Sequence, residues 1–256
     1  MMTRKNDVTI ILPNYNSQLY LEKTLKSVIS QTYQNWKLLI VDDNSNLETK
    51  KILNGYIKHK KIKIIFLTIN RGAAYCRNLA LKKIKSKYIA FIDSDDIWKK
   101  NKLKLQIDFM KKNGHKFTYT CYETIGQKKR KIYPPEKLNY ENFIGNTSIS
   151  TSTMIIEKNI IKNTRFAKTK VCEDYFFKCR ILKRINYAFC LNKILTKYRV
   201  RDDSLQSNNF KNLYWIWKIN SKYNKLNFFK NIFSIFSISS NSFKRYGLKN
   251  IFNLNT

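Results

Sequence analysis

The chain has 256 residues, of which 50 are Lys or Arg and 17 are Asp or Glu, so its formal net charge at pH 7 is +33. Hydrophobic residues make up 43 % of it, which is enough for a core and excludes disorder along the whole chain. A surface this basic is drawn to phosphate groups on nucleotides, nucleic acids or anionic lipids.

Residues 1–120 alternate short apolar runs with helical patterns. The runs predict strands and the segments after them predict helices: strands at 8–12, 37–41, 61–67 and 88–92, and helices at 19–31, 46–58, 71–84 and 99–112. This alternation is typical of parallel strands joined by right-handed crossovers, with helices on both faces of the sheet. Such strands are buried on both faces, which explains the continuous apolar runs. The sequence therefore predicts an α/β fold with a Rossmann-like, mostly parallel sheet.

The pattern is looser after residue 120. It predicts a polar loop at 127–139, strands at 150–158 and 194–200, and a helix at 172–185 that begins with acidic residues. From Ser204 to Thr256 the chain contains eight basic residues, many aromatic residues and no Asp or Glu. We expect one or two amphipathic helices in this C-terminal segment.

Cysteines and apolar runs predict the location of the protein. The five cysteines are an odd number and include no CxxC pair, which favours a reduced, cytoplasmic compartment. The N-terminal sequence MMTRKNDVTIILPNYN has too short an apolar run for a signal peptide. The run NIFSIFSIS near residue 235 is too short to cross about 30 Å of hydrocarbon. We expect a cytoplasmic protein that is soluble or peripheral on a membrane.

Two of the predicted strands end in carboxylates: Asp42 and Asp43 follow LLIV, and Asp93, Asp95 and Asp96 follow IAFI. In open parallel sheets the ligand crevice lies beyond the carboxyl ends of the strands, so both clusters are expected at one edge. Carboxylates this close repel one another unless a cation compensates. Mg²⁺ and Mn²⁺ bind one or two carboxylates together with substrate phosphates. Helix capping, the structural alternative, explains one Asp in each cluster but not three.

Four segments in order resemble the nucleotide-binding half of glycosyltransferase family 2, which has the GT-A fold: VTIILPNYN, LEKTLKSVISQTYQNWKLLIVDDNS, NRGAAYCRNLA and YIAFIDSDD. The resemblance covers about residues 8–110. It implies that Pro13 and Tyr15 line the pocket for the nucleotide base and that Asp43 bonds the base. It also implies that Arg71 or Arg77 reaches the nucleotide, and we favour Arg77. Taken alone, both arginines would be solvated helix charges.

The same resemblance implies how the second acidic cluster binds the donor. Asp93 and Asp95 form the Asp-x-Asp element that meets the ribose and the metal, with Asp95 as the metal ligand and Asp96 alongside. The implied cofactor is Mn²⁺ or Mg²⁺, and the implied donor is a nucleotide-diphosphate sugar, with a UDP-sugar as the first choice.

The second half resembles the family more faintly, through STSTMIIEK and CEDYFFKCRIL. In the family's acceptor region a Glu-Asp pair opens a helix, and here that pair is Glu173 and Asp174. The resemblance implies that Asp174 is the general base, which takes the proton of an acceptor hydroxyl in a single displacement with inversion. Glu173 remains an alternative base, and electrostatic capping of the helix N-terminus is the structural alternative for both.

The resemblance implies a nucleotide-sugar-binding GT-A half at 1–120 and an acceptor-binding half of the same domain at 121–203. Composition adds a third part, a basic, aromatic helical segment at 204–256. The expected activity is that of an inverting hexosyl- or N-acetylhexosaminyltransferase. It would act on a glycan acceptor, lipid-linked by this interpretation, in lipopolysaccharide or capsule biosynthesis. The aromatic C-terminal segment suits the anionic inner face of the cell membrane, although packing on the catalytic domain is the alternative.

Two other function classes compete with this expectation. A nucleotidyltransferase should carry a Gly-rich phosphate loop near its first strand, whereas this chain has LPNYNSQ there. A non-catalytic nucleic-acid-binding protein is suggested by the charge of +33, but it has no use for clustered carboxylates. We therefore expect no nucleic acid among the partners.

Overall fold

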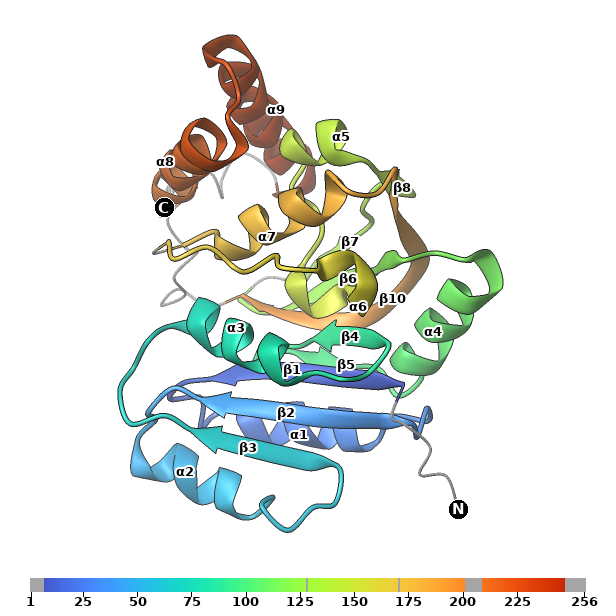
Figure 1. The fold of residues 1–256 in the computed structure, drawn as a ribbon, viewed down its shortest axis with the longest axis vertical. Helices are drawn as coiled ribbons and strands as arrows, with labels where there is room; N and C mark the ends of the chain where they lie inside the picture. Colours follow the sequence, from blue (N-terminus) through green and yellow to red (C-terminus); the bar gives the residue numbers. More distant parts are fainter. Residues whose placement is uncertain (1–6, 128, 170, 201–208, 247–256) are drawn as a thin grey trace.

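The computed structural model describes residues 7–127, 129–169, 171–200 and 209–246, and its centre is one mixed sheet with helices on both faces (Figure 1). The strand order is β3-β2-β1-β4-β9-β6-β10-β5. The first part of this sheet is parallel and consists of β1 (Val8–Asn14), β2 (Trp36–Asp42), β3 (Ile62–Phe66) and β4 (Tyr88–Phe91). These strands confirm the four that the apolar runs predict.

Helices cover both faces of the parallel strands, and each face has its own core. The helices that follow the first three strands are α1 (Leu21–Ile29), α2 (Leu47–Asn54) and α3 (Ala73–Lys83). Ile11 and Val41 pack with α3 on one face, whereas Ile10 and Leu12 pack with α1 on the other. Because alternate residues of a strand point to opposite faces, a strand between two cores must be apolar along its whole length.

The second part of the sheet is mixed. Its strands are β5 (Ile97–Trp98), β6 (Phe117–Gly126), β7 (Lys131–Ile132), β8 (Lys137–Leu138), β9 (Ile155–Glu157) and β10 (Ala188–Val200). β9 runs antiparallel between β4 and β6, and β10 runs parallel to β6. The associated helices are α4 (Lys102–Asn113), α5 (Tyr140–Ile144), α6 (Lys158–Ile161) and α7 (Glu173–Leu182).

Three expectations for this part are wrong in detail. The predicted strand at 150–158 is a 3₁₀ turn at Thr151–Thr153 followed by the short β9, and the predicted loop at 127–139 contains β7 and β8. β6 was not predicted, because its buried positions include Thr118, Thr120 and Thr124, whose hydroxyls interrupt the apolar run. Threonine is nevertheless β-branched and favourable in strands.

The C-terminal helices are present as α8 (Asn209–Ile219), a π-helical turn at Asn220–Asn224 and α9 (Phe228–Tyr246). They lie together beyond α7, at the end of the molecule far from β3 (Figure 1). Within the described ranges, none of the helices has both the length and the apolar character needed to span a bilayer. The division at 120/121 and 203/204 stays a prediction, although the sheet continues across its first boundary within β6.

Candidate active site

The carboxyl ends of β1 and β2 are tied together by Asp42. Asn14 Nδ2 donates a 2.7 Å hydrogen bond to Asp42 Oδ1, and Ser45 Oγ donates one of 2.6 Å to the same oxygen. Ser45 N donates to the other oxygen at 3.1 Å, and Ser17 Oγ donates to Asn14 Oδ1. Asp42 is fully buried, so the first aspartate of this pair fixes two loops rather than meeting a ligand.

Asp43 fixes the entry to α3. Its two carboxylate oxygens accept hydrogen bonds from the backbone N–H groups of Arg71 at 2.8 Å and Gly72 at 2.7 Å. Gly72 precedes α3 with φ +83°, a conformation that favours glycine because it has no Cβ. Each oxygen retains a lone pair, so the predicted contact between Asp43 and a nucleotide base stays a prediction.

Pro13 and Tyr15, the residues expected around the base, differ in exposure. Pro13 is buried within β1, where it lies opposite Val41 of β2. Tyr15 follows the end of the strand and is 52 % exposed. A large exposed aromatic ring at this edge offers a face on which a base can stack. Because Pro13 is buried, it can shape such a site only by supporting the exposed residues above it.

Arg77 connects the two predicted parts of the site. It lies on α3 with 5 % of its surface exposed, and its guanidinium donates to Asp93 Oδ1 at 2.6 Å and to Glu173 Oε1 at 2.8 Å. The ring of Phe166 lies 5.3 Å from its central carbon. Burial by itself would lower the pKa of Arg77, but the two carboxylates outweigh it and raise the pKa. The arginine expected to reach the nucleotide therefore bridges Asp93, which was predicted to bind the donor, and Glu173, which lies in the predicted acceptor region.

Asp93, Asp95 and Asp96 divide into two partly exposed residues and one buried residue. Asp96 is 1 % exposed, its Oδ1 accepts from the backbone N–H of Arg199 at 2.8 Å, and its backbone carbonyl accepts from Thr24 Oγ1 at 2.8 Å. Burial, and after it the charges of Asp95 and Asp93, raise the pKa of Asp96 well above its usual value. Asp96 thus anchors the cluster to α1 and β10, and it leaves Asp93 and Asp95 nearer the surface.

Asp174 is held by a second buried cation. Lys178, one turn further along α7, donates to Asp174 Oδ2 at 2.6 Å and to the Ile149 carbonyl at 2.6 Å. Thr151 Oγ1 donates to the same carboxylate oxygen at 2.8 Å. Burial would raise the pKa of Asp174, but Lys178, then Thr151 and Arg77, outweigh it and lower the pKa to about 2. For Glu173, burial prevails over Arg77 and raises the pKa.

Sequence analysis missed three polar partners of these acids. Lys178 had a usable signal, because a lysine four residues after an aspartate on a helix lies on the same face. Thr151 and Arg199 had none, since their contacts depend on the folding of the 3₁₀ turn and of β10 against segments 23 and 103 residues away.

The carboxylates at this edge suit one divalent cation that they would share with the phosphates of the sugar donor. Among the described residues, no group of three or more His, Cys, Asp or Glu side chains is arranged to hold a metal ion by itself. Asp93 and Asp95 could supply one or two oxygens, with phosphates of the donor completing the set, as is common for Mg²⁺. Burial is the main cause that raises the pKa of Asp96, and the charges of Asp95 and Asp93 add to it; an added cation would relieve this second cause.

Comparisons with known proteins agree with one another. Residues 9–185 match the family model described as glycosyl transferase family 2. The Escherichia coli protein named UDP-Glc:alpha-D-GlcNAc-diphosphoundecaprenol beta-1,3-glucosyltransferase (WfgD) is 37 % identical over 216 residues, which are 83 % of this chain and 84 % of that protein.

Solved structures share the fold. S. aureus TarS in complex with UDP-GlcNAc has a TM-score of 0.73 and 21 % identity, over 98 % of this chain and 76 % of that one. A mannosyltransferase from Pyrobaculum calidifontis in complex with GDP-Man and Mn²⁺ has a TM-score of 0.70 and 14 % identity, over 92 % of this chain and 70 % of that one.

Proposed function

The chain belongs to glycosyl transferase family 2 and is a glycosyltransferase of GT-A fold, and on that premise we propose that it transfers a sugar from a UDP-sugar to a hydroxyl of a lipid-diphosphate-linked glycan, with inversion. Membership of this family decides against a nucleotidyltransferase and against a non-catalytic nucleic-acid-binding protein. WfgD is named for a UDP-glucose donor and a diphosphoundecaprenol acceptor, and TarS was solved with UDP-GlcNAc. We propose lipopolysaccharide or capsule biosynthesis as the setting of the reaction, and an acceptor of that kind supports this proposal.

One observation carries the proposal: Arg77 holds Asp93 and Glu173 at 2.6 and 2.8 Å. Asp93 opens the Asp-x-Asp element at the end of β4, and Glu173 opens α7 next to Asp174. A single guanidinium therefore links Asp93, of the proposed donor site, to Glu173, the neighbour of the residue proposed to activate the acceptor. Displacement at an anomeric carbon requires a base on one side of the sugar and a leaving group on the other.

Asp174 is proposed to take the proton of the acceptor hydroxyl. Its carboxylate is ionised at neutral pH and is oriented by Lys178 and Thr151, so no proton has to leave before reaction. A carboxylate with a pKa of about 2 is a weak base. The proton therefore transfers late, after partial bonding to the anomeric carbon has made the attacking oxygen strongly acidic. Lys178 and Thr151 act as positioning residues.

The donor is proposed to bind at the edge formed by the ends of β1, β2 and β4. Tyr15 offers its exposed ring to the base, Pro13 shapes the site from below, and Asp43 fixes the loop that begins α3. Asp95 is the proposed ligand of Mn²⁺ or Mg²⁺. When bound with the diphosphate of the donor, such an ion neutralises charge on the departing nucleoside diphosphate.

Replacing Asp95 by Ala tests the proposed function. Nucleoside diphosphate release is measured with UDP-, GDP- and TDP-sugars, Mn²⁺ or Mg²⁺, and a synthetic GlcNAc-diphosphate lipid acceptor. We expect a UDP-sugar to release UDP, and this release to require the metal. In Asp95→Ala the release rate should fall by about 10²–10³-fold, because the proposed ligand of the ion that opposes the leaving-group charge is gone.

Asp108→Ala is the matched control, because Asp108 is an exposed aspartate on α4 outside the site. It should keep wild-type activity. Release by Asp95→Ala at the rate of this control would rule out the metal site, and no release from any donor in the presence of acceptor would rule out the proposed substrates.

The C-terminal helices support a position at the membrane surface, because α9 exposes a row of apolar side chains. Its buried side includes Asn231 and Ser234, which bond Trp217 and Ile144 carbonyls. Its exposed side carries a stripe at helical spacing, which we call the α9 stripe: Phe229, Ile232, Phe233 and Phe236, with the phenylalanines 70–80 % exposed. Trp215 and Trp217, also expected at the membrane, are only partly exposed.

Such a stripe, on a helix that also exposes Lys230, fits the interface of an anionic bilayer, and we propose peripheral contact with the inner face of the cell membrane. The double variant Phe229→Ser/Phe233→Ser should lower the affinity for phosphatidylglycerol vesicles, measured by sedimentation, by at least about tenfold. The reason is that burial of each phenylalanine side chain contributes about 1.5–3 kcal/mol of binding free energy. Leu19→Ser/Leu47→Ser is the control, since both leucines are exposed outside the stripe. Equal binding by the two double variants would contradict the proposal.

A further inference from the structure

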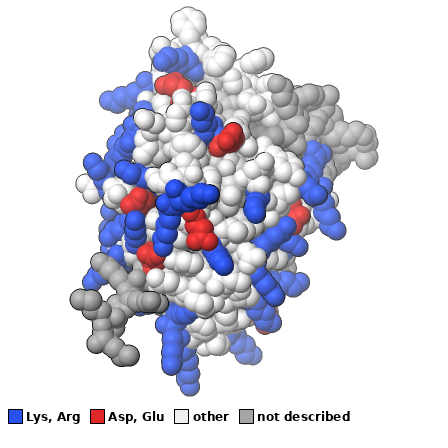
Figure 2. Space-filling model, turned by 90° about the vertical axis from the view of Figure 1, so that its right-hand side faces the viewer, with Lys and Arg blue, Asp and Glu red and all other residues white. Residues whose placement is uncertain are grey.

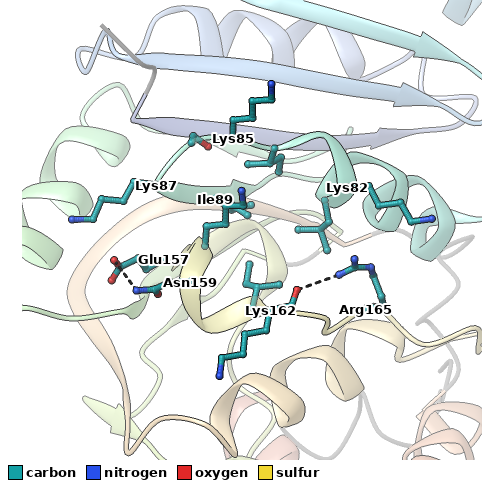
Figure 3. Close-up of a pocket in the computed structure, with 13 residues that line it drawn as sticks. Lys82, Lys85, Lys87, Ile89, Glu157, Asn159, Lys162 and Arg165 are labelled. Atoms are coloured by element: carbon teal, nitrogen blue, oxygen red, sulfur yellow. Dashed lines mark hydrogen bonds between the residues drawn. The ribbon is translucent and has the colours of Figure 1, made fainter.

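A cavity of about 580 Å³ lies at the start of β4, at the opposite end of this strand from the candidate active site. Figure 3 shows the residues that line it. Its floor is apolar and includes Leu81, Ile84, Ile89 and Ile161. It is bounded by the end of α3, the start of β4 and the segment from β9 to Arg165. β4 separates this cavity from Asp93, which lies four residues beyond Ile89 of the floor, or roughly 13 Å along the strand direction.

Basic side chains gather around this cavity. They make up six of its 13 lining residues, compared with 50 of 256 in the whole chain, so the cavity is enriched even for this protein. The six residues are Lys82, Lys85, Lys87, Lys158, Lys162 and Arg165. We call the cavity with these residues the basic pocket. Figure 2 shows the face at which the parallel strands begin, with Lys and Arg outnumbering Asp and Glu across it.

Most of this charge is uncompensated within the part of the chain that the structure describes. Lys82, Lys85, Lys158 and Lys162 form no ion pair with a described acidic side chain. Glu157 is the single acid that lines the pocket, and its Oε1 accepts from Asn159 Nδ2 at 3.2 Å.

The lysines can reach a ligand in the pocket. Figure 3 shows Lys82, Lys85, Lys87 and Lys162 on different sides of the opening, with their amino groups pointing away from its centre. A lysine carries its charge on a flexible four-carbon stem, so these amino groups can fold over an anion. A concave site lined by one sign of charge also concentrates counter-ions. Proposed donor and acceptor chemistry at the other end of β4 uses none of these residues.

We propose that the basic pocket is a second binding site, for a small phosphate-bearing anion. The volume lies within the range for small ligands, about 300–1,000 Å³, and is too small for a nucleic-acid duplex. Several lysines around one opening suit a ligand with more than one negative oxygen, because each charged contact adds to the others. The apolar floor accommodates the carbon skeleton of a phosphate ester. A free oligophosphate and an anionic lipid headgroup share this chemistry.

The test is a charge reversal on the pocket wall. Binding of tripolyphosphate and of monomeric dihexanoyl phosphatidylglycerol is measured by calorimetry on the full chain, with Lys158→Glu/Lys162→Glu compared with wild type. Both lysines are exposed, so the variant should fold. We expect affinity for at least one probe to fall by about tenfold or more, and wild-type affinity to fall with rising salt. Which probe binds distinguishes a free phosphate from a lipid headgroup.

Lys58→Glu/Lys60→Glu is the matched control, because these exposed lysines lie before β3 and outside the pocket. It changes the net charge equally and should alter affinity by less than about twofold. The donor edge also attracts phosphates, so binding alone does not decide the matter. Unchanged affinity in Lys158→Glu/Lys162→Glu, an equal loss in both double variants, or no binding of either probe to wild type would overturn the proposal.

Discussion

Replacing Asp174 by Asn is expected to lower kcat by about 10²–10⁴-fold and to leave the KM for the donor nearly unchanged. The amide keeps the shape of the carboxylate but cannot take the proton of the acceptor hydroxyl. Donor binding should persist, because Asp174 lies on α7, whereas the proposed donor contacts lie at the ends of β1, β2 and β4. Steady-state kinetics with a UDP-sugar and a lipid-linked acceptor measure both constants.

The neighbouring carboxylate provides the decisive comparison. Glu173→Gln keeps one hydrogen bond to Arg77 and should lower kcat less than Asp174→Asn, because Glu173 is proposed to hold Arg77 at 2.8 Å and Asp174 to take the proton. If Glu173→Gln is the more damaging variant and Asp174→Asn keeps more than about a tenth of wild-type kcat, then Glu173 is the base. Because Asp174→Asn leaves the buried Lys178 without its counter-charge, thermal unfolding must show that the assay temperature leaves the variant folded.

Replacing Arg77 by Met is expected to destabilise the protein by about 3–5 kcal/mol and to abolish activity. The substitution removes the cation shared by Asp93 and Glu173, so two carboxylates in a largely buried site lose their partner. A loss of that size is a large fraction of the stability of a typical domain, about 5–15 kcal/mol. Urea unfolding followed by circular dichroism measures the change.

Two further variants separate charge from packing at Arg77. Arg77→Met/Glu173→Gln should recover part of the lost stability, with a coupling of about 0.5–3 kcal/mol, because one of the unpaired charges is gone. Arg180→Met is the control, since Arg180 is an exposed arginine on α7 without an ion pair to a described residue. A loss below about 1 kcal/mol in Arg77→Met would show that the bridge does not hold the site together.

How far the sequence predicts this site depends on the distance over which each signal acts. The runs at 37–41 and 88–92 are local, and polar residues that follow a buried strand must emerge at its end, so the shared edge of the acidic clusters followed from the chain alone. The engagement of Arg77 did not follow, because its partners lie 16 and 96 residues away. The local sequence around an arginine gives no sign of whether its guanidinium faces a ligand or a pair of carboxylates.

Local pattern alone determined the parallel strands, the alternating helices, the acidic strand ends and the presence of helices in the C-terminal segment. The spacing of apolar residues and the turn residues are signals that act within a few positions of the chain. Tertiary structure alone decided that Asp96 is buried, that Lys178 holds Asp174, that β9 enters the sheet antiparallel, and that α9 turns its aromatic stripe outward. A helical period specifies which residues share a face, but only the packed fold specifies which face meets the core and which charges meet across it.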